Sequence, residues 1–137
     1  EAKLLYRSNV SINSDCKNEK ITAKNIVLAT GARARELPGM EADGDLIWTY
    51  KHALTPSRMP KKLLVIGSGA IGVEFASFYN TFGANTTIVE VLDRILPVED
   101  EDVSSLAAEQ FAKQGMTIKT GAKIQKLEKK RLRSLLN

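Results

Sequence analysis

The chain has very few of the residues that build redox, metal and hydrolytic sites: one cysteine, Cys16, and one histidine, His52, in 137 residues. A single thiol excludes an internal disulfide, a CxxC redox pair and a zinc site built from cysteines. With a single histidine, only His52 could serve as the base of a Ser-His-Asp triad or a Cys-His dyad. No apolar run approaches the roughly 18 residues of a membrane span, and residues 1–7 lack the apolar stretch of a signal peptide. We expect a soluble protein of a reducing compartment, with no catalytic residue and no metal site, in which Cys16 is an ordinary thiol and His52 a solvated side chain.

Acidic residues are scarce at the C-terminal end, which accounts for the net charge of +4. Between residues 123 and 137, six basic side chains are accompanied by one acid, Glu128. The remainder of the chain is close to neutral, so the charge does not describe a binding face spread over a domain. The segment also lacks the aromatic residues that stack on bases, and we expect no nucleic-acid binding.

Short apolar runs in the first part of the chain indicate β-structure. Three short strands are expected, near residues 4–6, 10–12 and 20–22. The continuous apolar run Asn25–Gly31 predicts a further strand, buried on both faces. Residues 1–33 are therefore expected to form a small β-rich segment. Residues 34–60 are expected to form a connector, with turns and a short helix or single turn at 48–54.

From Lys61 onwards, strands and helices alternate. The expected strands cover residues 63–66, 86–91 and 116–120, and the expected helices cover 73–82 and about 100–114. Gly83 and Gly115 are natural C-terminal stops for these helices. Five alternating elements predict two overlapping right-handed βαβ units on a parallel sheet. The expected fold class is α/β: an incomplete, Rossmann-type, three-layer domain over residues 61–127, followed by a basic tail at 128–137.

A glycine-rich loop joins the first strand and helix of this domain. GSGAIG matches G-x-G-x-x-G with Gly67, Gly69 and Gly72, directly after a strand and opening a helix, which is the context that dinucleotide binding requires. The three glycines would allow a tight turn, close approach of a pyrophosphate, and close packing of helix on strand, respectively. The phosphate would lie at the helix N-terminus, where the N–H groups around Ser68, Ala70 and Ile71 are expected to lack internal partners.

An acidic residue at the end of the next strand completes this pattern. Glu90 follows Gly67 at about the required distance of roughly 20 residues. Its carboxylate can accept hydrogen bonds from the ribose hydroxyls of an adenosine and would repel a 2′-phosphate. No arginine follows it directly, Arg94 being the first, so NAD is favoured over NADP.

Several segments together resemble the pyridine nucleotide-disulfide oxidoreductases, and within them the dihydrolipoamide dehydrogenases. The segments that carry the resemblance are Thr22–Arg33, Leu37–Gly39, Trp48–Lys51, Gly67–Glu74, and Ile88–Glu90 with Leu96-Pro97. Their order and spacing follow the family over residues 20–127. The resemblance implies that residues 1–33 are the last part of the first segment of an FAD domain.

The resemblance also implies roles for individual residues. Thr30, Gly31 and Ala32 match an element that contacts FAD, and Glu74 matches a glutamate near the nicotinamide. Ile124 matches an apolar residue close to the adenosine. The implied NAD-binding set is Gly67, Ser68, Gly69, Ala70, Ile71, Gly72, Val73, Glu74, Glu90 and Ile124.

The function implied by the resemblance is hydride transfer between FAD and NAD during reoxidation of dihydrolipoamide. The implied partners are the remaining FAD and dimerisation domains, a second copy in a homodimer, and lipoyl-bearing 2-oxoacid dehydrogenase complexes, in a bacterial cytoplasm or a mitochondrial matrix. Residues 1–137 hold neither the family's CxxxxC pair nor its His-Glu base. We therefore expect this chain alone to be inactive.

Two other interpretations remain open. The chain could be a stand-alone NAD-binding module without catalysis, or part of another NAD-using disulfide or flavin reductase of the same family. Glu90 argues against the NADP-using branches, and the connector Trp48–Lys51 favours dihydrolipoamide dehydrogenase.

Overall fold

The computed structural model describes residues 1–6, 8–14 and 17–129, which fall into two units, Glu1–Arg33 and Ala34–Asn137. Cys16 and most of the predicted basic tail lie outside the described residues. Among the described residues, no helix has the length and apolar character needed to cross a membrane.

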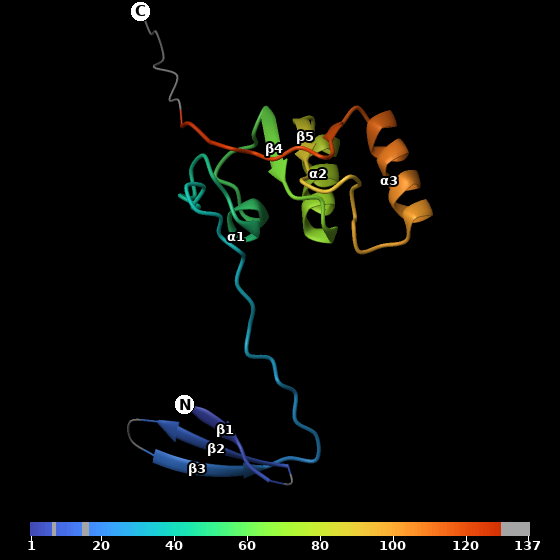
Figure 1. Ribbon diagram of the computed structural model, residues 1–137. Helices are drawn as coiled ribbons and strands as arrows, with labels where there is room; N and C mark the ends of the chain where they lie inside the picture. The colour runs from blue at the N-terminus through green and yellow to red at the C-terminus, as the bar shows by residue number, and fades with distance from the viewer. Residues whose placement is uncertain (7, 15–16, 130–137) are drawn as a thin grey trace, which may run out of the picture. The chain divides into compact units, whose positions relative to one another are not determined.

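The first unit contains a three-stranded antiparallel sheet (Figure 1). Its strands are β1 (Ala2–Leu4), β2 (Asn9–Ser14) and β3 (Lys17–Thr22), in the order β1-β2-β3. In β2, Val10 pairs with Leu4 on one side and with Ile21 on the other. The predicted β-rich character of this segment is therefore confirmed.

The predicted buried strand at residues 25–31 is wrong. This segment has no regular secondary structure, and the side chains of Val27 and Leu28 are 85% and 73% exposed. A strand is stable only when a neighbouring strand satisfies its backbone and an apolar face covers its side chains. No described residue supplies either to this segment, so its apolar composition alone does not make it a strand.

The second unit is built on a three-stranded parallel sheet in the order β4-β5-β6 (Figure 1). The chain alternates β4 (Lys62–Ile66), α2 (Ala70–Thr81), β5 (Asn85–Val89), α3 (Glu101–Lys113) and β6 (Thr117–Lys119), preceded by the short helix α1 (Tyr50–Leu54). The predicted α/β class and the predicted alternation are confirmed. A parallel neighbour requires a crossover, and α2 and α3 provide the two crossovers here.

Both long helices pack on the same face of this sheet. Val65, Ile88 and Ile118 are aligned across the three strands, and they pack with Ala76 of α2 and Phe111 of α3. The helices thus form one layer over one face.

On the other face of β4, Leu64 and Ile66 remain 48% and 41% exposed, although the apolar run at residues 63–66 is also typical of a fully buried strand. No helix among the described residues covers this second face. The described residues of this unit therefore form two layers, the sheet and the helices on one of its faces.

The ends of the two helices follow from local sequence. The Asp100 carboxylate caps α3 by accepting a hydrogen bond from the N–H of Asp102 at 3.0 Å. Gly83 and Gly115, which follow α2 and α3, both have φ of 90°, a conformation that strongly favours glycine. The predicted stops are confirmed. On α3, however, Val103 and Leu106 point outwards and are 51% and 59% exposed.

The connector is attached to α2 and to the C-terminal segment. The buried Tyr79 hydroxyl of α2 donates a hydrogen bond to the Ala53 carbonyl at 2.6 Å, and the Tyr79 ring lies 6.2 Å from that of Trp48. The Asp43 carboxylate pairs with Lys129 at 2.8 Å. In Figure 1 the segment leading to Lys129 runs across β5 and β4 towards the connector.

Candidate dinucleotide-binding site

The glycine loop turns tightly between β4 and α2. Gly67 has φ of +94°, and its N–H donates to the Val89 carbonyl at 2.9 Å, which fixes the loop beside the end of β5. A Cβ atom on Gly72 would overlap the carbonyl oxygen of Gly67. Gly67 is thus needed for the turn, and Gly72 for the close packing of the helix on the loop.

Gly69 differs from both, because a Cβ atom there would meet nothing within 4 Å. It is the N-cap of α2, with ordinary φ of −65°, and no side chain caps this helix end. Among the described residues, the N–H groups of Ala70, Ile71 and Gly72 have no hydrogen-bond acceptor. Open space in front of free N–H groups at a helix N-terminus suits the pyrophosphate of a dinucleotide.

The Ser68 amide corrects one expectation. It was predicted to be free for a phosphate, but it donates to the Glu90 carboxylate at 2.8 Å. Ser68 is fully buried between the ends of β4 and β5, so its N–H points towards the neighbouring strand end and away from the open space. The free donors are those of the helix itself.

Glu90 lies at the centre of this arrangement and is only 6% exposed. Its Oε2 accepts the Ser68 amide and the Ser68 hydroxyl at 2.8 and 2.7 Å, and its Oε1 accepts the Leu92 amide at 3.0 Å. Burial raises the pKa of Glu90, but the hydrogen bonds from Leu92, Ser68 and Val91 together lower it below its ordinary value. The carboxylate is therefore held ionised next to the glycine loop.

The other predicted NAD residues occupy different environments. Val73 is buried in the core, and Glu74 is exposed on the first part of α2. Ile124 is half-buried in the segment whose start is fixed to β5, where the Ala122 amide donates to the Glu90 carbonyl at 2.9 Å. The structure thus brings the loop and Glu90 together, with the segment that carries Ile124 attached beside them.

The residues assigned to FAD are not assembled into a site. Thr30, Gly31 and Ala32 are exposed and lie in the part of the first unit without regular structure. A Cβ atom on Gly31 would meet nothing within 4 Å. The described residues do not by themselves enclose a flavin here, because no side chain or strand among them covers this segment, and the FAD assignment stays a prediction.

His52 has a structural role that the sequence prediction missed. It is half-buried, and its Nδ1 accepts the Thr49 amide at 3.1 Å in a capping box at the start of α1. The expectation of a solvated His52 is therefore wrong. The sequence did contain a signal for this role: Thr49 stands three residues before His52, the spacing of a capping box, and a histidine ring can accept a hydrogen bond. In the described part of the chain, no group of three or more His, Cys, Asp or Glu side chains could hold a metal ion.

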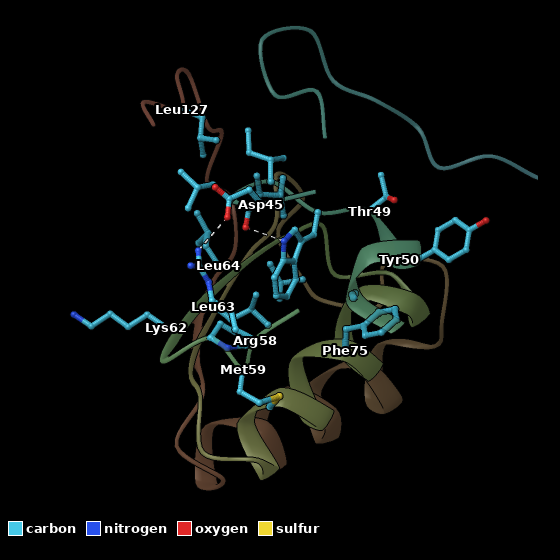
Figure 2. A pocket seen from close by; sticks show the side chains of 18 of the residues that line it. Asp45, Thr49, Tyr50, Arg58, Met59, Lys62, Leu63, Leu64, Phe75 and Leu127 are labelled. Carbon is cyan, nitrogen blue, oxygen red and sulfur yellow. Dashed lines mark hydrogen bonds and ion pairs between the residues drawn. The ribbon is translucent and has the colours of Figure 1, made fainter. Parts of the chain in front are cut away.

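A cavity of about 710 Å³ lies beside β4, between the connector and the exposed face of the strand (Figure 2). Leu63, Leu64 and Phe75 line it, and Leu127 closes one side. Neither Ser68 nor Glu90 lines this cavity. Ile71 and Gly72 at the start of α2 do line it, so the cavity adjoins the candidate site that the loop and Glu90 form.

Comparison with known proteins gives the chain its family. The family model described as pyridine nucleotide-disulphide oxidoreductase matches residues 3–135. The chain belongs to this family. Its members are oxidoreductases that use FAD and a pyridine nucleotide.

Similar relatives carry the name dihydrolipoyl dehydrogenase. The protein from Zymomonas mobilis is 60% identical over 110 residues, which are 80% of this chain and 24% of the relative. The protein from Rhizobium etli is 56% identical over 108 residues, or 79% of this chain and 22% of the relative. The chain thus spans about a quarter of the length of these relatives.

Solved structures of related enzymes have the same fold. LpdA from Mycobacterium tuberculosis superimposes with a TM-score of 0.68 at 30% identity, over 86% of this chain and 26% of LpdA. The HOCl-induced flavoprotein disulfide reductase RclA from Escherichia coli gives 0.66 at 29% identity, over 92% of this chain and 28% of RclA.

Proposed function

We propose that this chain is the NAD-binding part of a flavin-dependent dihydrolipoyl dehydrogenase. The observation that carries the proposal is a buried, ionised Glu90 joined by hydrogen bonds to a glycine loop whose helix N-terminus has free N–H groups. The identity to dihydrolipoyl dehydrogenases supports the choice of enzyme within the family.

Each part of the site has one task in this proposal. The free N–H groups at the start of α2 bind the pyrophosphate, and the absent Cβ of Gly69 leaves room for it. The ionised Glu90 accepts a hydrogen bond from the adenosine ribose. NAD supplies a nicotinamide ring that exchanges a hydride with the flavin, and Glu74 lies towards that end.

The surroundings of Glu90 favour NAD over NADP. A 2′-phosphate next to an ionised carboxylate is repelled unless a cation neutralises it. Arg94, the nearest arginine in sequence, is directed elsewhere: its guanidinium is 3.5 Å from the Pro97 carbonyl and 3.9 Å from the Glu101 carboxylate. No cationic side chain is paired with Glu90 in the described residues.

The complete reaction would need further parts. A disulfide pair and a flavin would take electrons from dihydrolipoamide, and Thr30, Gly31 and Ala32 would contact that flavin. The partners that we propose are the remaining FAD and dimerisation domains, a second copy in a homodimer, and lipoyl-bearing 2-oxoacid dehydrogenase complexes. With one cysteine, the chain alone is proposed to be inactive.

Calorimetric titration of the purified chain with NAD and NADP tests the proposal. Glu90→Ala removes a charged hydrogen-bond acceptor, so NAD affinity should fall about ten- to hundredfold. Glu99→Ala, which removes an exposed glutamate outside the site, is the matched control and should bind NAD like the wild type. Equal affinities of the wild type for NAD and NADP, or of Glu90→Ala and the wild type for NAD, would contradict it.

A second assay tests the inactivity of the chain. NADH-dependent reduction of lipoamide by the purified chain should not exceed the rate in buffer. Clear turnover would refute the proposal that the reaction requires a disulfide pair and a complete FAD domain.

A further inference from the structure

Ser68 holds the ligand-binding carboxylate but cannot itself reach a ligand. Its side chain is fully buried, and its hydroxyl and amide both donate to Oε2 of Glu90. The Leu92 amide donates to Oε1 at 3.0 Å, and the Val91 amide also faces the carboxylate. Since Oε2 already accepts both donors of Ser68, Oε1 is the oxygen that would accept a hydroxyl of a ligand.

Ser68 is itself fixed from several sides. Its carbonyl accepts the Leu96 amide at 3.0 Å, and the preceding Gly67 amide donates to Val89 at 2.9 Å. The hydroxyl of Ser68 therefore has a defined position from which it can orient the carboxylate.

We infer that Ser68 is a positioning residue whose hydroxyl holds Oε2 of Glu90 and thereby directs Oε1 towards the ribose of the bound nucleotide. The inference rests on the proposed function, since it concerns the same ligand. In this inference Ser68 sets the orientation of the carboxylate, and the charge of Glu90 repels a 2′-phosphate. A variant of Ser68 should therefore weaken NAD binding without removing the preference for NAD over NADP.

Variants of the two residues should differ in a characteristic way. Ser68→Ala leaves Glu90 charged and bound to the amides of residue 68 and Leu92, but it removes the hydroxyl that helps to fix Oε2, so NAD affinity should fall about three- to tenfold while NADP remains disfavoured. Glu90→Ala should lose both affinity for NAD and the preference for NAD over NADP. Once Glu90 is absent, adding Ser68→Ala should change NAD affinity less than about twofold, because Ser68 acts through the carboxylate.

Ser104→Ala is the matched control. It also removes a buried serine hydroxyl from a hydrogen bond in the neighbouring loop, but it does not contact the carboxylate. Ser68→Cys replaces the hydroxyl by a slightly larger thiol, which is a weaker donor, and should give an intermediate loss of affinity.

The first measurement is the affinity of the full chain for NAD and NADP by calorimetry, for the wild type, the single variants and the double variant. The cycle supports the inference if the Ser68 effect disappears without Glu90. An undiminished effect of Ser68→Ala in the Glu90→Ala background, or an equal loss in Ser104→Ala, would overturn it.

The second measurement needs no ligand: the pKa of Glu90 from carboxyl ¹³C chemical shifts. The carboxylate faces the Ser68 hydroxyl and the amides of Ser68, Val91 and Leu92, and β6 contributes only the Lys119 carbonyl, which accepts the Glu90 amide. Ser68→Ala should raise the pKa of Glu90, and Ser104→Ala should leave it unchanged. An unchanged pKa in Ser68→Ala would overturn the inference, whereas failure of the wild type to bind NAD would refute the proposed function without affecting this readout.

Discussion

Substitution by alanine should have different effects at two glycines of the G-x-G-x-x-G motif: Gly69, the N-cap of α2, and Gly72, in the first turn of α2. A Cβ atom on Gly72 would overlap the Gly67 carbonyl, whereas one on Gly69 would extend into open space. Gly72→Ala should therefore damage folding, and Gly69→Ala should damage only ligand binding.

The magnitudes follow from what each methyl group meets. At Gly72, helix propensity favours alanine by about 1 kcal/mol, but overpacking against a fixed backbone costs about 3 kcal/mol or more. The net loss of unfolding free energy should be at least about 2 kcal/mol. At Gly69, alanine restricts the unfolded chain, which stabilises by about 0.4–1 kcal/mol. It is also a poorer N-cap than glycine by a similar amount, about 0.5–1 kcal/mol, so the stability should hardly change.

Urea unfolding followed by circular dichroism measures the stability, and calorimetry with NAD measures the affinity. Gly69→Ala should unfold at the wild-type midpoint yet bind NAD at least about tenfold more weakly, because its methyl group competes with the pyrophosphate. Wild-type stability of Gly72→Ala would refute the tight packing of α2 on the loop. Wild-type NAD affinity of Gly69→Ala would refute the position of the pyrophosphate.

Two further predictions concern the connector. Tyr79→Phe leaves the Ala53 carbonyl without its donor and should lower the unfolding free energy by about 1–3 kcal/mol. Tyr50→Phe, which removes a hydroxyl without a partner among the described residues, should unfold like the wild type, and equal urea midpoints for both variants would contradict this. The hydrogen bond from Lys129, followed by the amide of Ile47, lowers the pKa of Asp43 below 3.8. Asp43 thus stabilises the fold above pH 4 or so, and the effect is lost as the pH falls below that value. Asp43→Asn should flatten the decline of Tm between pH 5 and 2, and parallel curves would refute this.

The parts of the fold that were predictable depend on short-range signals. Gly83, Gly115 and the acidic run before α3 mark helix ends through backbone conformation and capping, which act within a few residues. The alternation of strands and helices required a parallel sheet, because each crossover contains a helix. The juxtaposition of the glycine loop and Glu90 followed from the same rule, since both lie at the carboxyl ends of adjacent strands.

What was not predictable depends on partners distant in sequence. Asn25–Gly31 and β4 have similar apolar composition, yet only β4 has a neighbouring strand. Composition records how apolar a segment is but not whether another element covers it. The double contact of Ser68 with Glu90 was missed for a related reason, because the position x of G-x-G-x-x-G accepts any residue.

The candidate NAD and FAD residues differ in what holds them in place. The hydrogen bonds that shape the loop and hold the Glu90 carboxylate come from residues between Gly67 and Leu96, and the Glu90 backbone is joined in addition to Lys119 and Ala122. Thr30, Gly31 and Ala32 have no comparable support, since they are exposed and outside regular structure. A site whose contacts all come from nearby segments of the chain can keep its geometry without the rest of an enzyme. An exposed segment takes up a fixed geometry only when another element packs on it. We therefore expect recognition of the nucleotide by this chain to be independent of a flavin, whereas the flavin contacts require the remaining FAD domain.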